Sequence, residues 1–167
     1  DLRHEEVRTV PMNDREVLVM VRDVTDSKLA EIRLNQYKRM ISNMKDGVAL
    51  VDRNYIYQVV NQVYLDRNQK PWNEIVGHSI AELHGEIVFR TMIQPRFDQC
   101  LAGEIQEYED WFDYKTIGRR FVRVTYSPYF EPDGTITGVV VTTYDRTALK
   151  QVESQIEIQN AILERIA

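Results

Sequence analysis

The order of predicted strands and helices between residues 46 and 145 is the feature that most constrains the fold. Two short apolar strands come first, "GVALVD" and "YIYQVV", joined by a compact polar turn. Several short helical segments follow, interrupted by glycines. Three longer strands then lie at about 104–115, 119–130 and 135–144. Because helices do not alternate regularly with strands, this order predicts an α+β fold with an antiparallel sheet, not a βαβ repeat.

The last of these strands runs directly into a helical pattern, with no loop residues between them. The segment "ITGVVVTTYDRTALKQVE" (136–153) parallels an earlier one, "REVLVMVRDVTDSKLAE" (15–31). Each contains a β-branched strand, then Asp-x-Thr, then a helix with an early Lys and Glu. Asp and Thr side chains can satisfy the free amides at a helix start, so no loop is needed. The residues expected to relay movement across these junctions are Asp23, Thr25, Asp145 and Thr147.

The repeat predicts tandem copies of one module, the first represented only by its last strands. Residues 1–25 form a predicted β-hairpin, which cannot bury its apolar face alone. The hairpin therefore belongs to an upstream module or docks on the rest of the chain, and the sequence leaves both alternatives open.

Two helices flank the central segment, at 26–45 and 147–167. Each carries apolar residues spaced alternately by three and four, the pattern of a coiled-coil seam. We therefore expect coiled-coil-like helices that pair with those of a second subunit, giving a homodimer. The seam residues are Leu34, Tyr37, Ile41, Met44, Leu149, Val152, Ile156, Leu163 and Ile166.

Composition excludes several classes of function for these 167 residues. The net charge of −5 disfavours nucleic acid as a partner, because phosphate binding needs a basic face. No apolar run approaches the roughly 18 residues of a membrane span. Cys100 is the sole cysteine, which fits a reducing, cytoplasmic compartment.

The sequence lacks recognisable catalytic and metal-binding motifs. It has no Gly-x-Gly-x-x-Gly and no phosphate-binding loop with Gly-Lys-Ser/Thr. Its three histidines do not form metal-ligand spacings. No serine or cysteine lies in a strained, glycine-flanked turn. We therefore expect the chain itself to be neither an enzyme nor a metal site.

Three segments resemble a PAS domain: "DGVALVDRNYIYQVVNQVYL" (46–65), "NEIVGHSIAEL" (73–83) and "FVRVTYSPYFEPDGTITGVVVTTYDRT" (121–147). The last ends in the Asp-x-Thr that couples a PAS sheet to its output helix. The resemblance implies a domain at 46–146, with a five-stranded sheet and short helices on one face enclosing a pocket. The hairpin at 1–25 is similar to the end of an upstream PAS domain.

The resemblance implies a sensory or dimerisation module in a bacterial signalling protein. Such a module relays a ligand- or partner-induced change through its C-terminal helix, here 147–167. The expected receiver is an effector domain in the same chain, a histidine kinase of a two-component system or a cyclic-di-GMP enzyme. Two alternatives stay open: a small-molecule carrier or enzyme of α+β fold, and a PAS spacer that binds no ligand.

The pocket of such a domain would be lined by apolar and aromatic residues, which alternatively just fill a core. Trp111 and Tyr126 carry hydrogen-bond donors that would orient a ligand. The pocket candidates are Phe89, Met92, Phe97, Leu101, Trp111, Val124, Tyr126 and Val141.

No motif identifies a cofactor. PAS domains hold haem, flavin, a small acid or nothing. Haem-binding members supply a histidine from the helical segment, but neither His78 nor His84 lies in a haem-ligating pattern. We interpret a lone histidine at a helix end as a surface or capping residue. Residues 98–101 lack the arginine and the spacing of the flavin-photosensor motif, so the cofactor stays open.

Overall fold

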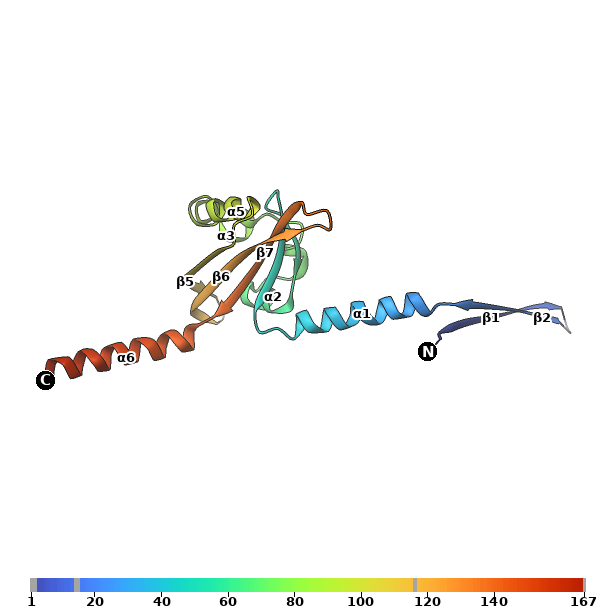
Figure 1. The fold of residues 1–167 in the computed structure, drawn as a ribbon, viewed down its shortest axis with the longest axis horizontal. Helices are drawn as coiled ribbons and strands as arrows, with labels where there is room; N and C mark the ends of the chain where they lie inside the picture. The colour runs from blue at the N-terminus through green and yellow to red at the C-terminus, as the bar shows by residue number, and fades with distance from the viewer. Residues whose placement is uncertain (1–2, 14–15, 116, 167) are drawn as a thin grey trace. The chain divides into compact units, whose positions relative to one another are not determined.

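The computed structural model describes residues 3–13, 16–115 and 117–166. The chain divides into two compact units, Asp1–Asn43 and Met44–Ala167. Both are drawn in Figure 1.

The first unit contains a β-hairpin and one helix. Strands β1 (Glu5–Asn13) and β2 (Glu16–Asp23) pair antiparallel, so the predicted hairpin is present. Helix α1 (Thr25–Ser42) follows directly and buries none of its residues. The valines of the hairpin are exposed as well. The apolar side chains of this unit are therefore exposed. An isolated two-stranded hairpin of this kind is at best marginally stable.

The second unit is built on a five-stranded antiparallel sheet in the order β4-β3-β7-β6-β5. This confirms the predicted α+β fold. The strands are β3 (Gly47–Asp52), β4 (Tyr57–Val60), β5 (Gln106–Tyr114), β6 (Gly118–Phe130) and β7 (Ile136–Asp145). The central strands approach closely at Gly138, where a Cβ atom would collide with the carbonyl oxygen of Val51.

Short helices connect β4 to β5 and cover one face of the sheet (Figure 1). Asn61 caps the first of them, because its side chain accepts a hydrogen bond from the Tyr64 amide. Pro95 lies in the first turn of the last one. The helices are α2 (Gln62–Asn68), η1 (Trp72–Glu74), α3 (Ile80–His84), α4 (Glu86–Val88), η2 (Phe89–Ile93) and α5 (Gln94–Leu101).

The core lies between the sheet and these helices. Its fully buried side chains come from both layers: Val51, Tyr57, Ile75, Phe97, Cys100, Val122 and Val139. Burying one large aliphatic or aromatic side chain stabilises a fold by about 1.5–3 kcal/mol, so this cluster holds the unit together.

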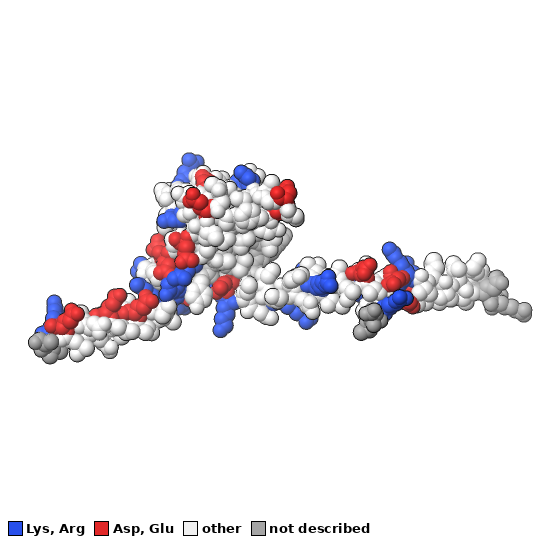
Figure 2. Space-filling model, viewed as in Figure 1, with Lys and Arg blue, Asp and Glu red and all other residues white. Residues whose placement is uncertain are grey.

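Helix α6 (Thr147–Ile166) leaves the sheet directly after β7. Charged side chains lie along the length of α6, and uncharged surface lies beside them (Figure 2). Its predicted seam residues Leu149, Val152, Ile156 and Leu163 are all exposed, and the side chain of Ile166 lies outside the described part. On α1 and just after it, Leu34, Tyr37, Ile41 and Met44 are exposed too. Pairing of either seam with a second subunit stays a prediction.

Among the helices described, none is both long enough and apolar enough to cross a membrane.

Candidate functional site

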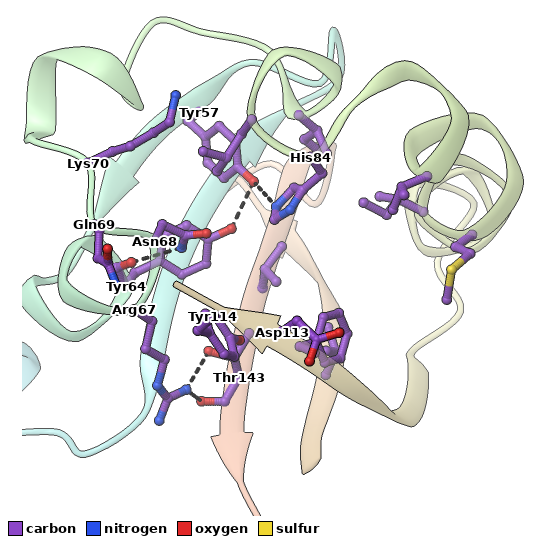
Figure 3. Close-up of a pocket in the computed structure, with 18 of the residues that line it drawn as sticks. Tyr57, Tyr64, Arg67, Asn68, Gln69, Lys70, His84, Asp113, Tyr114 and Thr143 are labelled. Atoms are coloured by element: carbon purple, nitrogen blue, oxygen red, sulfur yellow. Dashed lines mark hydrogen bonds between the residues drawn. The ribbon is translucent and has the colours of Figure 1, made fainter. Parts of the chain in front are cut away.

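A cavity of about 620 Å³ lies between the sheet and the helices of the second unit (Figure 3). Its sheet wall comes from β4, β5, β6 and β7, and its helical wall from α2, α3, α4 and η2. Cavities of this size hold small-molecule ligands in other proteins. Within the described residues, no group of three or more His, Cys, Asp or Glu side chains could hold a metal ion.

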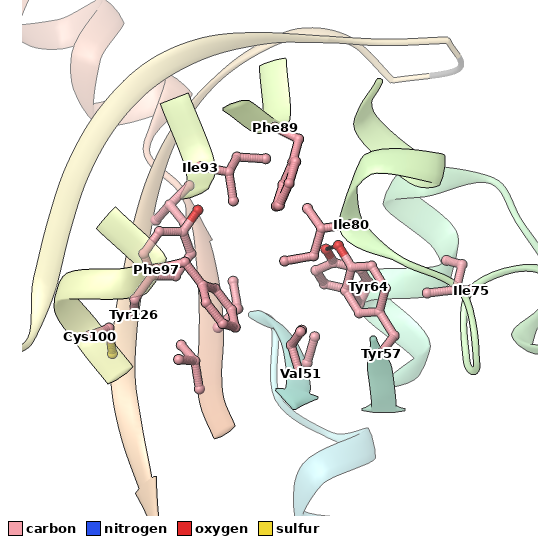
Figure 4. Close-up of a cluster of buried hydrophobic side chains, with 14 of the residues drawn as sticks. Val51, Tyr57, Tyr64, Ile75, Ile80, Phe89, Ile93, Phe97, Cys100 and Tyr126 are labelled. Carbon is pink, nitrogen blue, oxygen red and sulfur yellow. Dashed lines mark hydrogen bonds between the residues drawn. The ribbon is translucent and has the colours of Figure 1, made fainter. Parts of the chain in front are cut away.

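Four of the eight predicted pocket residues line this cavity: Met92, Val124, Tyr126 and Val141. Three others pack in or against the core and do not line it. Phe89 and Phe97 are buried there (Figure 4), and Leu101 packs against the same cluster. For these three, the alternative that they fill a core describes their position.

The prediction that Trp111 lines the pocket is wrong. Its side chain lies on the opposite face of the sheet, 38% exposed, with the Arg119 guanidinium 5.2 Å from its ring centroid. Successive side chains of a strand point to opposite faces, so Trp111 shares a face with Glu107 and Glu109. The even-numbered side chains of β5 point to the other face, where Tyr108, Phe112 and Tyr114 line the cavity. The strict alternation of β5 was the available signal.

Three polar side chains form a hydrogen-bonded chain on the cavity wall. The Tyr57 hydroxyl lies 2.8 Å from the Tyr64 hydroxyl and 3.2 Å from His84 Nε2 (Figure 3). Burial raises the pKa of both tyrosines, and it lowers the pKa of His84 to about 4. All three groups are therefore uncharged at neutral pH.

The interpretation of both histidines as surface or capping residues holds for His78 and is wrong for His84. His78 is exposed and pairs with Glu82 at 2.6 Å. His84 instead lines the cavity, where α3 contributes it to the helical wall together with Ile80 and Leu83. Because its Nε2 lies 3.2 Å from the Tyr57 hydroxyl, the His84 ring is held in a hydrogen-bonded chain.

Two further polar groups lie on the wall. The Tyr108 and Tyr126 hydroxyls are 3.2 Å apart, and burial raises the pKa of both side chains. Arg67 donates to the carbonyl and hydroxyl oxygens of Thr143 at 2.7 and 2.8 Å and to the Lys45 carbonyl at 3.1 Å. Sequence reasoning found Tyr126 but missed Tyr108, Arg67 and Thr143, because these three come from separate segments of the chain.

The junction between β7 and α6 is fastened by Asp145 and Thr147, both predicted relay residues. The Thr147 amide and hydroxyl donate to Asp145 Oδ1 at 2.9 and 2.6 Å. The Thr147 hydroxyl in turn accepts from the Phe121 amide at 2.9 Å, and the Arg146 amide donates to the Phe121 carbonyl at 2.8 Å. The first turn of α6 is therefore bonded to β6 as well as β7.

Asp145 is ionised at this junction. Burial alone would raise its pKa, but the hydrogen bonds from Thr147, together with Arg120 and Arg67, hold the pKa below its usual value. The carboxylate therefore keeps its acceptor role at neutral pH.

The first unit repeats this geometry at the predicted positions. The Thr25 amide donates to Asp23 Oδ1 at 2.9 Å. The Thr25 hydroxyl accepts from the His4 amide at 2.8 Å, and the Val24 amide donates to the His4 carbonyl at 2.9 Å. The strand registers also correspond, since Glu5 pairs with Asp23 as Val122 pairs with Asp145.

Ionic contacts add a second link between the sheet and α6. Glu109, on edge strand β5, accepts hydrogen bonds from Arg123 at 2.8 Å and from Arg146 at the junction. Arg146 also lies 3.5 Å from Glu153 on α6. Arg146 and Arg123 hold the pKa of Glu109 below its usual value.

The family described as the PAS fold matches residues 41–151 of this chain. No curated protein is similar enough in sequence to be matched.

Several solved structures share the fold. The PAS domain of Bordetella pertussis BvgS is 18% identical with a TM-score of 0.58, over 78% of this chain and 98% of that one. A C-terminal domain from Streptococcus mutans is 18% identical with a TM-score of 0.55, over 87% and 97%. The PAS domain of an HTR-like protein from Haloarcula marismortui is 15% identical with a TM-score of 0.57, over 72% and 97%.

Proposed function

The chain belongs to the PAS family, and on that basis we propose that Met44–Ala167 is a sensory module that relays a change in its cavity to helix α6. One observation carries this proposal. The strands that line the cavity, β6 and β7, are the ones bonded to the first turn of α6 through Asp145 and Thr147. A rigid junction transmits displacement, whereas a flexible loop would absorb it.

The contact of Glu109 with Arg146 supports a second route for the same signal. Strand β5 presents Tyr108 and Phe112 to the cavity and Glu109 to the opposite face. A shift of this strand would move the carboxylate that holds Arg146. The proposed output is a rotation or register change of α6.

We propose that α6 acts as one of a pair in a homodimer. Its apolar residues Leu149, Val152 and Ile156 are exposed at heptad spacing, which a second copy of the helix would cover. Analytical ultracentrifugation at tens of micromolar tests this. A dimer is expected, and a monomer both for residues 1–167 and for a longer chain would contradict it.

The proposed receiver is an effector domain further along the parent chain, a histidine kinase or a cyclic-di-GMP enzyme. Asp145→Ala in the full-length protein should leave the fold intact and uncouple effector activity from the module. Asp133→Ala is the matched control, since Asp133 makes the same two bonds to Thr135, at 2.9 and 2.6 Å, in the β6–β7 turn. Unaltered effector regulation in Asp145→Ala would overturn the relay.

We further propose that β1 and β2 are the last two strands of an upstream PAS module. The matching hydrogen bonds and strand register support this. Val17 and Val19 are exposed, while the corresponding Val139 and Val141 are buried. In a longer chain that restores the upstream residues, amides of β2 should exchange hydrogen more slowly. Unchanged exchange would contradict the assignment.

A further inference from the structure

The hydrogen-bonded chain of Tyr64, Tyr57 and His84 has one more polar hydrogen than the hydrogen bonds between its members use. Each hydroxyl contributes one hydrogen and a neutral imidazole contributes one. The two bonds of the chain, Tyr64 to Tyr57 and Tyr57 to His84 Nε2, use two of them. The remaining hydrogen is therefore at one end of the chain, and an open lone pair is at the other.

The direction of this chain can reverse without moving a heavy atom. In one direction, His84 Nδ1 carries the spare hydrogen and the Tyr64 oxygen is the open acceptor. In the other, the Tyr64 hydroxyl carries it and His84 Nδ1 accepts. The hydrogen bond to Tyr57 is made by Nε2, and no partner for Nδ1 of His84 is found among the described residues. The wall therefore offers one donor and one acceptor and can adapt to a ligand that presents either.

An anionic group is a poor match for this wall. A desolvated carboxylate needs several donors or a cation, and the chain has one spare hydrogen. Burial keeps His84 uncharged at neutral pH, so the ring supplies no positive charge. The inner wall thus selects against charge.

The charged residues that line the cavity either interact with other protein groups or are exposed to water. Arg67 donates to main-chain carbonyls, and Lys70 lies 3.9 Å from Glu74. Asp113 and Lys115 are exposed. Charges exposed to water interact weakly, so Lys70, Asp113 and Lys115 give an anion little compensation for losing its hydration. The half-buried Arg67 directs its guanidinium to Thr143 and to the Lys45 carbonyl.

The rest of the wall is apolar. Ile80, Leu83 and Val88 line the helical side next to His84, and Phe112, Val124 and Val141 line the sheet side. A flat or compact hydrocarbon body would fit between these two surfaces.

From these observations we propose that the cavity binds an uncharged small molecule, with an apolar body between sheet and helices and an amide or hydroxyl group bonded to the Tyr64–Tyr57–His84 chain. This inference rests on the proposed function, in which the cavity is the input site.

A library of matched aryl amides and aryl carboxylates tests the proposal, using ligand-observed NMR with the full 167-residue chain. We expect amides to bind at about 1 mM or below and to bind about tenfold more tightly than the matching carboxylates. Tyr57→Phe, which removes the middle hydroxyl, should weaken amide binding about fivefold or more. Tyr64→Phe is the second variant, and Tyr129→Phe, on the opposite face, should change nothing.

Three results would overturn the proposal: carboxylates that bind as tightly as the amides, amide affinities unchanged in both tyrosine variants, or no binder at about 1 mM. The proposed ligand class and the proposed relay can fail independently of each other. Amide binding without any response of α6 would contradict the relay and leave the ligand class standing. Carboxylate binding with a response of α6 would do the reverse.

Discussion

The two strand–helix junctions of this chain have the same hydrogen bonds but very different surroundings. In both, an Asp side chain accepts from a Thr amide, and the Thr hydroxyl accepts from the neighbouring strand. Yet Val139 and Val141 before the second junction are 0% and 7% exposed, while Val17 and Val19 before the first are 58% and 54% exposed. Local chemistry sets the junction, and burial depends on the rest of the sheet and its helices.

This difference bears on the proposed relay. The second junction connects a packed core and its cavity to a helix, so a change in packing has a path outward. The first junction has the same connection, but it follows a hairpin without a core of its own. Under the proposed relay, the same motif needs a complete module before it can couple a change to its helix.

The largest expected effect comes from placing a charge at the equivalent valines. Val139→Asp should destabilise the second unit by about 4 kcal/mol or more, because the carboxylate would be buried without a partner. Val17→Asp should change stability by less than about 0.5 kcal/mol, since the site is exposed. Urea unfolding followed by the fluorescence of Trp72 and Trp111 measures the first, and hydrogen exchange of the hairpin amides measures the second. Equal effects would refute the contrast in burial.

The next largest difference is expected on lowering the pH, which should destabilise the second unit. The pKa of His84 is lowered to about 4 in the fold, against about 6.5 in an unfolded chain. Between these values the unfolded state binds a proton that the folded state does not, so stability is lost as pH falls from about 6.5 to about 4. The loss should reach about 2–3 kcal/mol in the second unit. His84→Gln should flatten this pH dependence while His78→Gln keeps it; an unchanged slope in His84→Gln would assign the titration elsewhere.

The smallest effect concerns the junction threonines. Thr147→Val leaves the Phe121 amide without its acceptor next to a residue that is 6% exposed, which should cost about 1–3 kcal/mol. Thr25→Val removes the equivalent bond at a more exposed site, where water can replace it, and should cost less than about 1 kcal/mol. Paired urea titrations and hairpin hydrogen exchange compare the two. A greater loss at Thr25 would contradict the proposed role of burial.

Local patterns predicted the fold and the junction well. The order of strands and helices along the chain and the Asp-x-Thr chemistry each depend on residues close together in sequence, where propensity and spacing are informative. The placement of Trp111 failed although the alternation of β5 pointed the other way.

The polar chain in the cavity could not be predicted in this way. Tyr57, Tyr64 and His84 belong to three different elements and meet only after the helices pack on the sheet. No spacing in the sequence marks them. The low pKa of His84 is also a consequence of burial, which single-sequence patterns do not determine.

Hydrogen exchange of α6 after a substitution in the cavity tests the central claim most directly. Val141→Phe enlarges a side chain that lines the cavity on β7, and Val140→Phe places the same atoms on the other face. We predict that Val141→Phe changes amide exchange in residues 147–160, that Val140→Phe does not, and that adding Asp145→Ala abolishes the change. An equal response of α6 in the Asp145→Ala background would show that the junction does not carry the signal.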